Sequence, residues 1–245
     1  MAEKKSKKDI NCVGNAKYYL GLANELLLKK NYKEAIDNFL LSIMQDRNNS
    51  KAYIGLGLAY KNIKNYDKAI KAFLKAQTLS HNEKTVLKEL AMCNILEKNY
   101  DNGMKYLMEA IKLYPDDVDM QMQLAIVHEM IEEEDMALMI YQKIIETNPD
   151  YIRAYIQKAT LYMHLEDYLN CAKMFNKVLR MKKDYYRAFL ALGICYEKLD
   201  NPQIARRYYK KYLAYDKDAQ NYKKIIKRIN NLSEENTSPV KLRIV

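Results

Sequence analysis

Cysteine and histidine are the residue types here that could support catalysis or metal binding, and both are scarce. The chain has four cysteines, Cys12, Cys93, Cys171 and Cys195, and three histidines, His81, His128 and His164. No C-x-x-C pair occurs, and no histidine lies at a useful local spacing from a cysteine or a carboxylate. A zinc site needs such spacings. We therefore expect no metal and no cofactor.

Motifs for phosphate, hydride or acyl chemistry are missing as well. The sequence contains no G-x-x-x-x-G-K, G-x-G-x-x-G, H-E-x-x-H or G-x-S-x-G. Cys93, Cys171 and Cys195 occupy helical packing positions, so we expect buried small side chains rather than nucleophiles. His164, near the end of an expected helix, is the one histidine that could touch a ligand. The sequence thus predicts a protein that is not an enzyme.

Composition indicates a folded chain without a membrane span. Hydrophobic residues make up 49% and charged residues 29% of 245 positions, which argues against disorder. The apolar runs fall far short of the roughly 20 residues that cross a bilayer. The Lys-rich start, residues 1–11, lacks the apolar core of a secretory signal, and we expect a cytoplasmic location. The net charge of +10 permits an acidic partner.

A period of 34 residues organises the chain. Two columns hold only Ala, Gly or Cys through six successive units: Ala23, Gly57, Ala91, Ala125, Ala159 and Gly193, then Ala35, Ala69, Gly103, Ala137, Cys171 and Ala205. A third column holds large residues: Phe39, Phe73, Leu107, Tyr141, Phe175 and Tyr209. Small residues let helices approach closely while large residues fill the space beside them. Each unit is therefore expected to be a pair of helices.

Turn and cap residues delimit these helices. Asn or Asp recurs near each unit boundary, where its side chain is expected to cap the next helix, at Asn48, Asn82, Asp116, Asp150, Asp184 and Asp218. Within units, Asn31, Asn65, Asn99, Asp167 and Asn201 mark the turn between the two helices. The cap at Asp218 predicts a further helix over 219–231 that covers the end of the stack.

The pattern resembles the tetratricopeptide repeat, as in Leu56, Gly57, Tyr60, Ala69, Phe73 and Ala76 of the second unit. This resemblance implies an all-α fold, a right-handed superhelical α-solenoid of six helix pairs with a C-terminal capping helix. We expect repeats at 16–49, 50–83, 84–117, 118–151, 152–185 and 186–219, inside a solenoid spanning 16–231. Residues 1–15 form a basic, disordered segment in this interpretation, and 232–245 form a tail.

The fourth unit departs from the family pattern. It has Gln121, His128 and Glu134 where bulky or aromatic residues are expected, so we expect it to be the least tightly packed.

The C-terminal tail has two interpretations. It is either a disordered end or a plug that enters an apolar groove, because Val240, Leu242, Ile244 and Val245 alternate with cations.

The resemblance implies that the first helices line a concave surface where ligands bind. Its fifth and ninth positions are our candidate partner-binding residues: Leu20, Asn24, Ile54, Leu58, Lys88, Met92, Met122, Ile126, Ile156, Thr160, Leu190 and Ile194. Nine of them form an apolar stripe, and four cations follow one margin: Lys17, Lys51, Arg153 and Arg187. A contiguous exposed apolar strip is typical of a protein-binding groove. The alternative is that the facing wall of a tightly curved solenoid covers part of the stripe.

These features favour a non-catalytic adaptor or scaffold. Its partner would be a protein or peptide with apolar anchors and acidic flanks. The Lys/Asn/Arg clamp with which some family members hold chaperone carboxylates is disfavoured, because the first three repeats offer Leu20, Asn24, Gly55, Thr85 and Glu89 at its positions.

Two other classes of function remain open. The basic and aromatic stretch 206–212, continued by Lys223, Lys224, Lys227 and Arg228, is compatible with an RNA-associated protein. We consider nucleic acid the weaker interpretation, because Tyr209 and Tyr212 fall in core columns. An oligomerising structural subunit, using the apolar stripe to form a homo-oligomer, is the other alternative.

Overall fold

A computed structural model describes residues 15–80, 83–215 and 219–234. In this part of the chain there are thirteen α-helices and no strand. The helices are α1 (Ala16–Leu28), α2 (Tyr32–Gln45), α3 (Ser50–Asn62), α4 (Tyr66–Leu79), α5 (Lys84–Leu96), α6 (Tyr100–Leu113), α7 (Val118–Met130), α8 (Glu134–Thr147), α9 (Ile152–His164), α10 (Tyr168–Met181), α11 (Tyr186–Lys198), α12 (Pro202–Tyr215) and α13 (Ala219–Glu234). The expected all-α fold is confirmed. The N-terminal segment before Asn15 and the tail after Glu234 lie outside the described residues.

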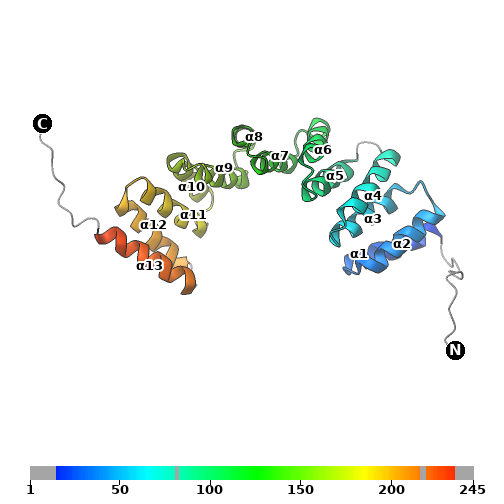
Figure 1. The fold of residues 1–245 in the computed structure, drawn as a ribbon, viewed down its shortest axis with the longest axis horizontal. Coiled ribbons are helices and arrows are strands. Elements are labelled where there is room, and N and C mark those ends of the chain that lie inside the picture. The colour runs from blue at the N-terminus through cyan, green and yellow to red at the C-terminus, as the bar shows by residue number, and fades with distance from the viewer. Residues whose placement is uncertain (1–14, 81–82, 216–218, 235–245) are drawn as a thin grey trace, which may run out of the picture. The chain divides into compact units, whose positions relative to one another are not determined.

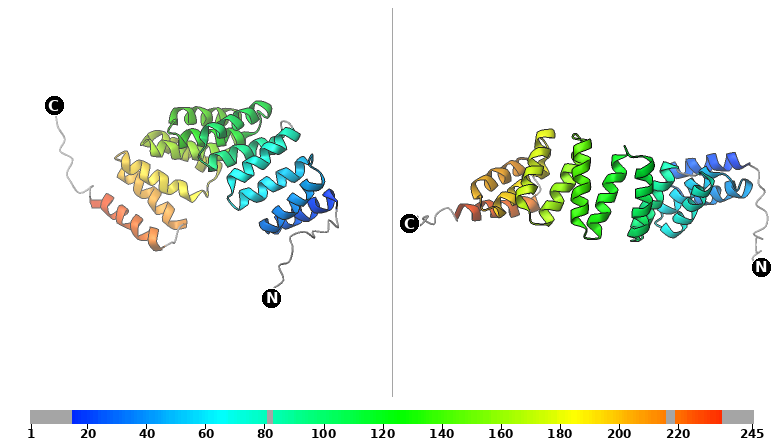
Figure 2. Two further views of the ribbon diagram at one scale, coloured as in Figure 1. Left: turned by 45° about the vertical axis from the view of Figure 1, so that its right-hand side comes forward. Right: turned by 90° about the horizontal axis from the view of Figure 1, so that it is seen from above.

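The chain divides into two compact units, residues 1–127 and 128–245. In the first unit, neighbouring helices pack on one another in order from α1 to α6, and in the second unit they do so from α8 to α13 (Figures 1 and 2). The division falls within α7, in the repeat for which we expected the loosest packing. That looser packing stays a prediction.

The small-residue columns lie where neighbouring helices approach most closely. Ala23, Ala35, Ala69 and Ala205 are fully buried. At Gly193 a Cβ atom would come within 2.4 Å of the Tyr209 ring, and at Gly57 within 2.6 Å of the Phe73 ring. Glycine at these two positions therefore lets the rings come closer to the backbone of the neighbouring helix than a Cβ atom would allow.

Each turn within a helix pair repeats one backbone geometry. Lys30, Lys64, Lys98, Glu132, Glu166 and Asp200 all have φ between 54° and 61°. The next residue donates its amide back into the first helix, for example Asn65 N to Tyr60 O at 2.9 Å. This is a Schellman-type helix end in which a charged residue occupies the left-handed position that usually favours glycine. The Asn and Asp residues expected at these turns follow it directly and begin the second helices.

The predicted caps at the unit boundaries were one residue early. Asn49, not Asn48, caps α3 by accepting the Ala52 amide, and Asp117 rather than Asp116 accepts the Met120 amide. Tyr151 and Tyr185 occupy the cap positions expected for Asp150 and Asp184. The aspartates at 150 and 184 instead accept a backbone amide two residues on through their carbonyl oxygens, as turn residues do. Asn82 and Asp218 lie outside the described residues.

Helix α13 closes the second unit and is longer than expected. Ile225, Ile229 and Leu232 are buried against Phe189, Ala205, Tyr209 and Tyr212 of α11 and α12. The predicted end at residue 231 omitted Leu232, which continues the same apolar face by a three-residue step. None of the described helices combines the length and the apolar character needed to cross a membrane.

Candidate functional site

In the first unit, the predicted stripe is a partly buried surface anchored in the core. Leu20 packs on the cluster around Ala23 and Phe39, Ile54 and Leu58 on the cluster around Phe73, and Met92 on the cluster around Leu87. Each of these four side chains keeps intermediate exposure, whereas Asn24 and Lys88 are exposed.

One stripe residue is corrected by the structure. Met122 is fully buried, with 0% exposure, so it belongs to the interior and not to an open surface. The period placed it on the same face as Ile54, but a column position alone does not report what covers the side chain. Ile126, one helical turn later, keeps intermediate exposure.

In the second unit the predicted residues surround a depression of about 220 Å³. Thr160 and Met163 come from α9, Phe175 from α10, and Arg187, Leu190, Ala191 and Ile194 from α11. We call this set the unit 2 pocket. Thr160, Leu190 and Ile194 belong to the predicted stripe and Arg187 to its predicted basic margin, and all four line this one depression. Ile156 lies on α9 one turn before Thr160 and packs on the core.

The unit 2 pocket is apolar inside and cationic at its edge. Leu190 and Ile194 pack on the cluster around Phe189 and Tyr209, which holds them in place. The Thr160 hydroxyl donates to the Ile156 carbonyl oxygen at 2.9 Å, so its hydrogen-bonding need is met within the helix. Arg187 is exposed, and a hydrogen bond to Tyr186 raises the pKa of its guanidinium. The pocket thus offers an apolar surface beside a permanent positive charge.

Three lining residues were not predicted. Met163 lies three residues after Thr160 on the same helix, so helical spacing could have identified it. Ala191 adjoins Leu190 in the sequence, and Phe175 belongs to the large-residue column that we assigned entirely to the core. Phe175 is 6% exposed, and the edge that it shows forms part of the pocket wall.

The remaining cations of the predicted margin are also exposed. Each is the second residue of its helix, Lys17 in α1, Lys51 in α3 and Arg153 in α9, as Arg187 is in α11. The Arg153 guanidinium donates to the Tyr151 hydroxyl at 3.4 Å. Each cation therefore stands in solvent at the start of a first helix of its own repeat.

The three cysteines of the repeats and one of the histidines are buried in the packed interior. Cys93, Cys171 and Cys195 are buried, and burial raises the pKa of Cys93 to about 12. Cys195 and Cys171 are in hydrogen-bond contact, with 3.2 Å between their sulfur atoms. His128 is buried with its Nδ1 2.6 Å from a Glu133 oxygen, and His164 is exposed. Within the described ranges, no three His, Cys, Asp or Glu side chains gather as metal ligands would.

Family models of one kind match four segments of the chain. Models described as tetratricopeptide repeat match residues 50–83, 89–117, 152–185 and 187–219. The chain belongs to the tetratricopeptide repeat family, as the resemblance implied. The fold of this family implies a scaffold for protein–protein interaction, and its members are typically non-catalytic.

Solved structures share the fold at low sequence identity. The C-terminal part of a TPR repeat-containing protein from Cytophaga hutchinsonii has a TM-score of 0.73 at 16% identity, covering 89% of this chain and 96% of that one. PilW, a type IV pilus biogenesis factor, has a TM-score of 0.67 at 17% identity, with coverages of 86% and 98%. YrrB, described as a TPR protein with an unusual peptide-binding site, has a TM-score of 0.59 at 17% identity, with coverages of 77% and 97%. No curated protein matches the chain in sequence.

Proposed function

We propose that this protein is a non-catalytic adaptor that binds a peptide segment of a partner protein through its first helices. The observation that carries the proposal is the unit 2 pocket, where predicted stripe residues line one apolar depression beside Arg187. The similarity to YrrB, itself described as having a peptide-binding site, supports the same class of function.

The chemistry of the unit 2 pocket favours a ligand with an apolar anchor next to an acidic residue. An aliphatic or aromatic anchor would enter between Thr160, Leu190 and Ile194, and an acidic residue next to it would pair with Arg187. Since Arg187 is solvated, this pair contributes mainly orientation and on-rate rather than a large free energy. The partly buried residues of the first unit, such as Ile54 and Leu58, would take further anchors of a longer segment.

Modest affinity is expected. Each buried anchor contributes about 1.5–3 kcal/mol, while association costs roughly 4–15 kcal/mol. Three or four anchors therefore give micromolar or weaker binding, and a tighter complex would need a longer ligand.

A selection from random peptides tests the proposal without knowledge of the partner. The full chain is used to select 12-residue peptides from a display library, and their affinities are measured by fluorescence anisotropy. We expect an aliphatic or aromatic residue flanked by Asp or Glu to be enriched. Ala191→Leu, which fills the unit 2 pocket, and Arg187→Glu should each weaken binding at least tenfold.

Matched controls separate the pocket from general effects. Ala214→Leu adds the same atoms at an exposed site on α12, and Lys198→Glu reverses a charge at the far end of α11. Both should bind the selected peptides like the unaltered protein. Selected peptides that bind Ala191→Leu as well as the parent would contradict the proposal.

A further inference from the structure

The charged residues of the second helices of the last two repeats, and of α13, are almost all positive. Between them α10, α12 and α13 hold eleven Lys and Arg residues and a single acidic residue, Glu234. Neither α10 nor α12 contains any acid. Lys173 and Lys177 of α10 stand 34 residues before Arg207 and Lys211 of α12, so the repeat brings equivalent cations side by side on one face.

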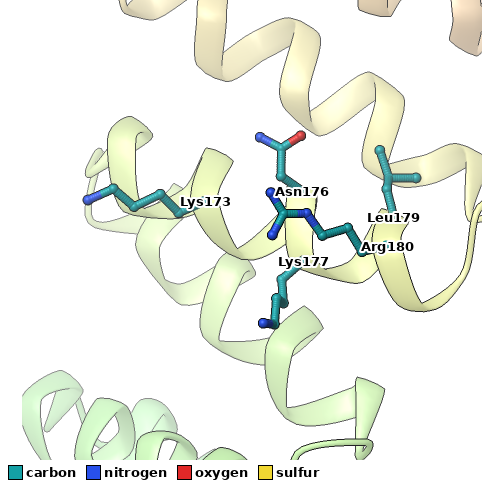
Figure 3. Close-up of a pocket in the computed structure, with 5 residues that line it drawn as sticks. All are labelled: Lys173, Asn176, Lys177, Leu179 and Arg180. Carbon is teal, nitrogen blue, oxygen red and sulfur yellow. The ribbon is translucent and has the colours of Figure 1, made fainter.

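These cations border two depressions in the surface. The first, of about 480 Å³, is lined by Lys173, Asn176, Lys177, Leu179 and Arg180, and Figure 3 shows all five side chains extending from α10. The second, of about 370 Å³, is lined by Tyr196, Ile204, Arg207, Tyr208 and Lys211. The Tyr208 hydroxyl donates to Asn176 Oδ1 at 3.2 Å, so one hydrogen bond joins the walls of the two depressions.

Aromatic rings lie next to the cations. Tyr196 and Tyr208 are nearly parallel, with centroids 5.6 Å apart, and Lys211 Nζ lies 5.5 Å from the Tyr208 ring centroid. The array continues through Phe189, which stacks on Tyr208 and on Tyr215. Tyr215 also stacks on Tyr186, but it is 55% exposed, so part of its side chain is open to a ligand.

The cations are not neutralised within the described part of the chain. No carboxylate there forms an ion pair with Lys177, Arg180, Arg207 or Lys211. On α4, by contrast, Lys71 pairs with Asp67 at 2.7 Å, and on α6 the position equivalent to Lys177 is Glu109. Every other second helix carries at least one acidic residue, so the absence of acids is a property of α10 and α12 rather than of the repeat pattern.

We infer that this face of α10 and α12, with the adjoining tyrosines, binds single-stranded nucleic acid. Phosphates would lie along the two depressions against Lys177, Arg180, Arg207 and Lys211, and bases would stack on rings of the Tyr196–Tyr208–Tyr215 array. A basic track with aromatic platforms is the arrangement that single strands require. The site shares no residue with the unit 2 pocket, so it goes beyond the proposed adaptor function. It also revises our preference against nucleic acid, which considered Tyr209 and Tyr212, both buried, but not Tyr208.

Binding of a fluorescein-labelled 15-nucleotide oligo(U) to the full chain tests the inference. At 50 mM salt we expect saturable binding that weakens steeply as salt is added, since each neutralised phosphate contributes about −0.7 to the slope of log K against log salt. Lys177→Glu/Arg207→Glu should lose at least tenfold in affinity. The control Lys71→Glu/Lys75→Glu, at the same repeat positions on α4, should lose less than twofold.

Two further arms distinguish a nucleic acid from other anions. Tyr215→Leu keeps every charge and should weaken oligo(U) binding several-fold, while binding of heparin, which has no bases, should not change. Tyr208→Leu should act in the same direction, with thermal melting to verify its fold. The inference is overturned if oligo(U) does not bind, if the α4 control loses as much as the test variant, or if both tyrosine variants bind oligo(U) unchanged. Tighter binding to vesicles containing phosphatidylserine than to oligo(U) would also overturn it.

Discussion

In the large-residue column, a buried tyrosine hydroxyl requires a hydrogen-bond acceptor elsewhere in the same repeat. Phe39, Phe73, Leu107 and Phe175 have no polar atom in their side chains, but the two tyrosines in this column bring a hydroxyl into the core. Tyr141 donates its hydroxyl to Glu129, and Tyr209 donates to Glu197. Each glutamate lies twelve residues before its tyrosine, where the other repeats have Leu27, Lys61, Ile95 or Met163. The glutamates are therefore structural, because a buried hydroxyl needs an acceptor.

Replacing Glu129 should reveal this dependence. Glu129→Met leaves the buried Tyr141 hydroxyl without its acceptor and should lower the free energy of unfolding by about 1–3 kcal/mol in urea denaturation. Glu129→Met/Tyr141→Phe recreates the Met163 and Phe175 combination of the next repeat and should recover most of the loss. Equal destabilisation in the single and double variants would show that the hydroxyl is not the cause.

A second residue-scale prediction concerns acid stability. Burial alone would raise the pKa of Asp117, but hydrogen bonds from Lys84, at 2.6 Å, and from the Met120 amide hold it below its usual 3.8. The folded state therefore binds this proton less readily than the unfolded chain. The resulting stability is present above about pH 4 and is lost as the pH falls through the folded-state pKa.

Urea denaturation at pH 6 and pH 3 checks this sign. The unaltered chain should lose more stability between the two pH values than Asp117→Asn, which has no carboxylate to protonate. Lys84→Met should show a similarly reduced pH dependence, because it removes the partner that lowers the pKa. Parallel pH profiles for all three proteins would contradict the assignment.

At the scale of elements, every repeat has one turn residue whose left-handed backbone conformation is energetically unfavourable. A non-glycine residue with φ near 60° is disfavoured, yet Lys98 adopts φ 61° between α5 and α6. Lys98→Gly should therefore raise the free energy of unfolding by about 0.5–1 kcal/mol, measured by chemical denaturation.

The same substitution inside a helix should have the opposite sign. Lys75→Gly, at an exposed position within α4, should lower stability by about 1 kcal/mol. A loss of stability in both variants would mean that the turn does not favour glycine.

Helix pairs were predictable from sequence because packing imposes a strict period. Small residues at Ala23 or Gly193 and large ones at Phe39 or Tyr209 are required wherever two helices touch, so they recur every 34 residues. Helix starts were less predictable, since Asn49 and Tyr151 both serve as caps and a polar neighbour one position earlier competes for the assignment. Local chemistry permits either position, and only the backbone geometry decides.

At the scale of the whole molecule, the repeat columns predicted some parts of the surface and missed others. They predicted that Leu190, Ile194, Thr160 and Arg187 share one surface, because these residues lie at regular intervals on first helices. They did not identify Met122 as buried, since burial depends on neighbours that the column does not specify. The sequence pattern indicated the basic stretch 206–212 but not the cations of α10, because the signal there is an absence of acids rather than the presence of a motif.

Binding of a partner's peptide by the first helices is tested most directly by methyl NMR. An unlabelled peptide from the display selection is titrated into protein with labelled Ile, Leu, Met and Thr methyl groups. We predict saturable shifts for Thr160, Met163, Leu190 and Ile194, with no change at Leu74 and Met139, which are exposed on the second helices α4 and α8. Shifts confined to second-helix methyl groups, with those of the unit 2 pocket unmoved, would contradict the account.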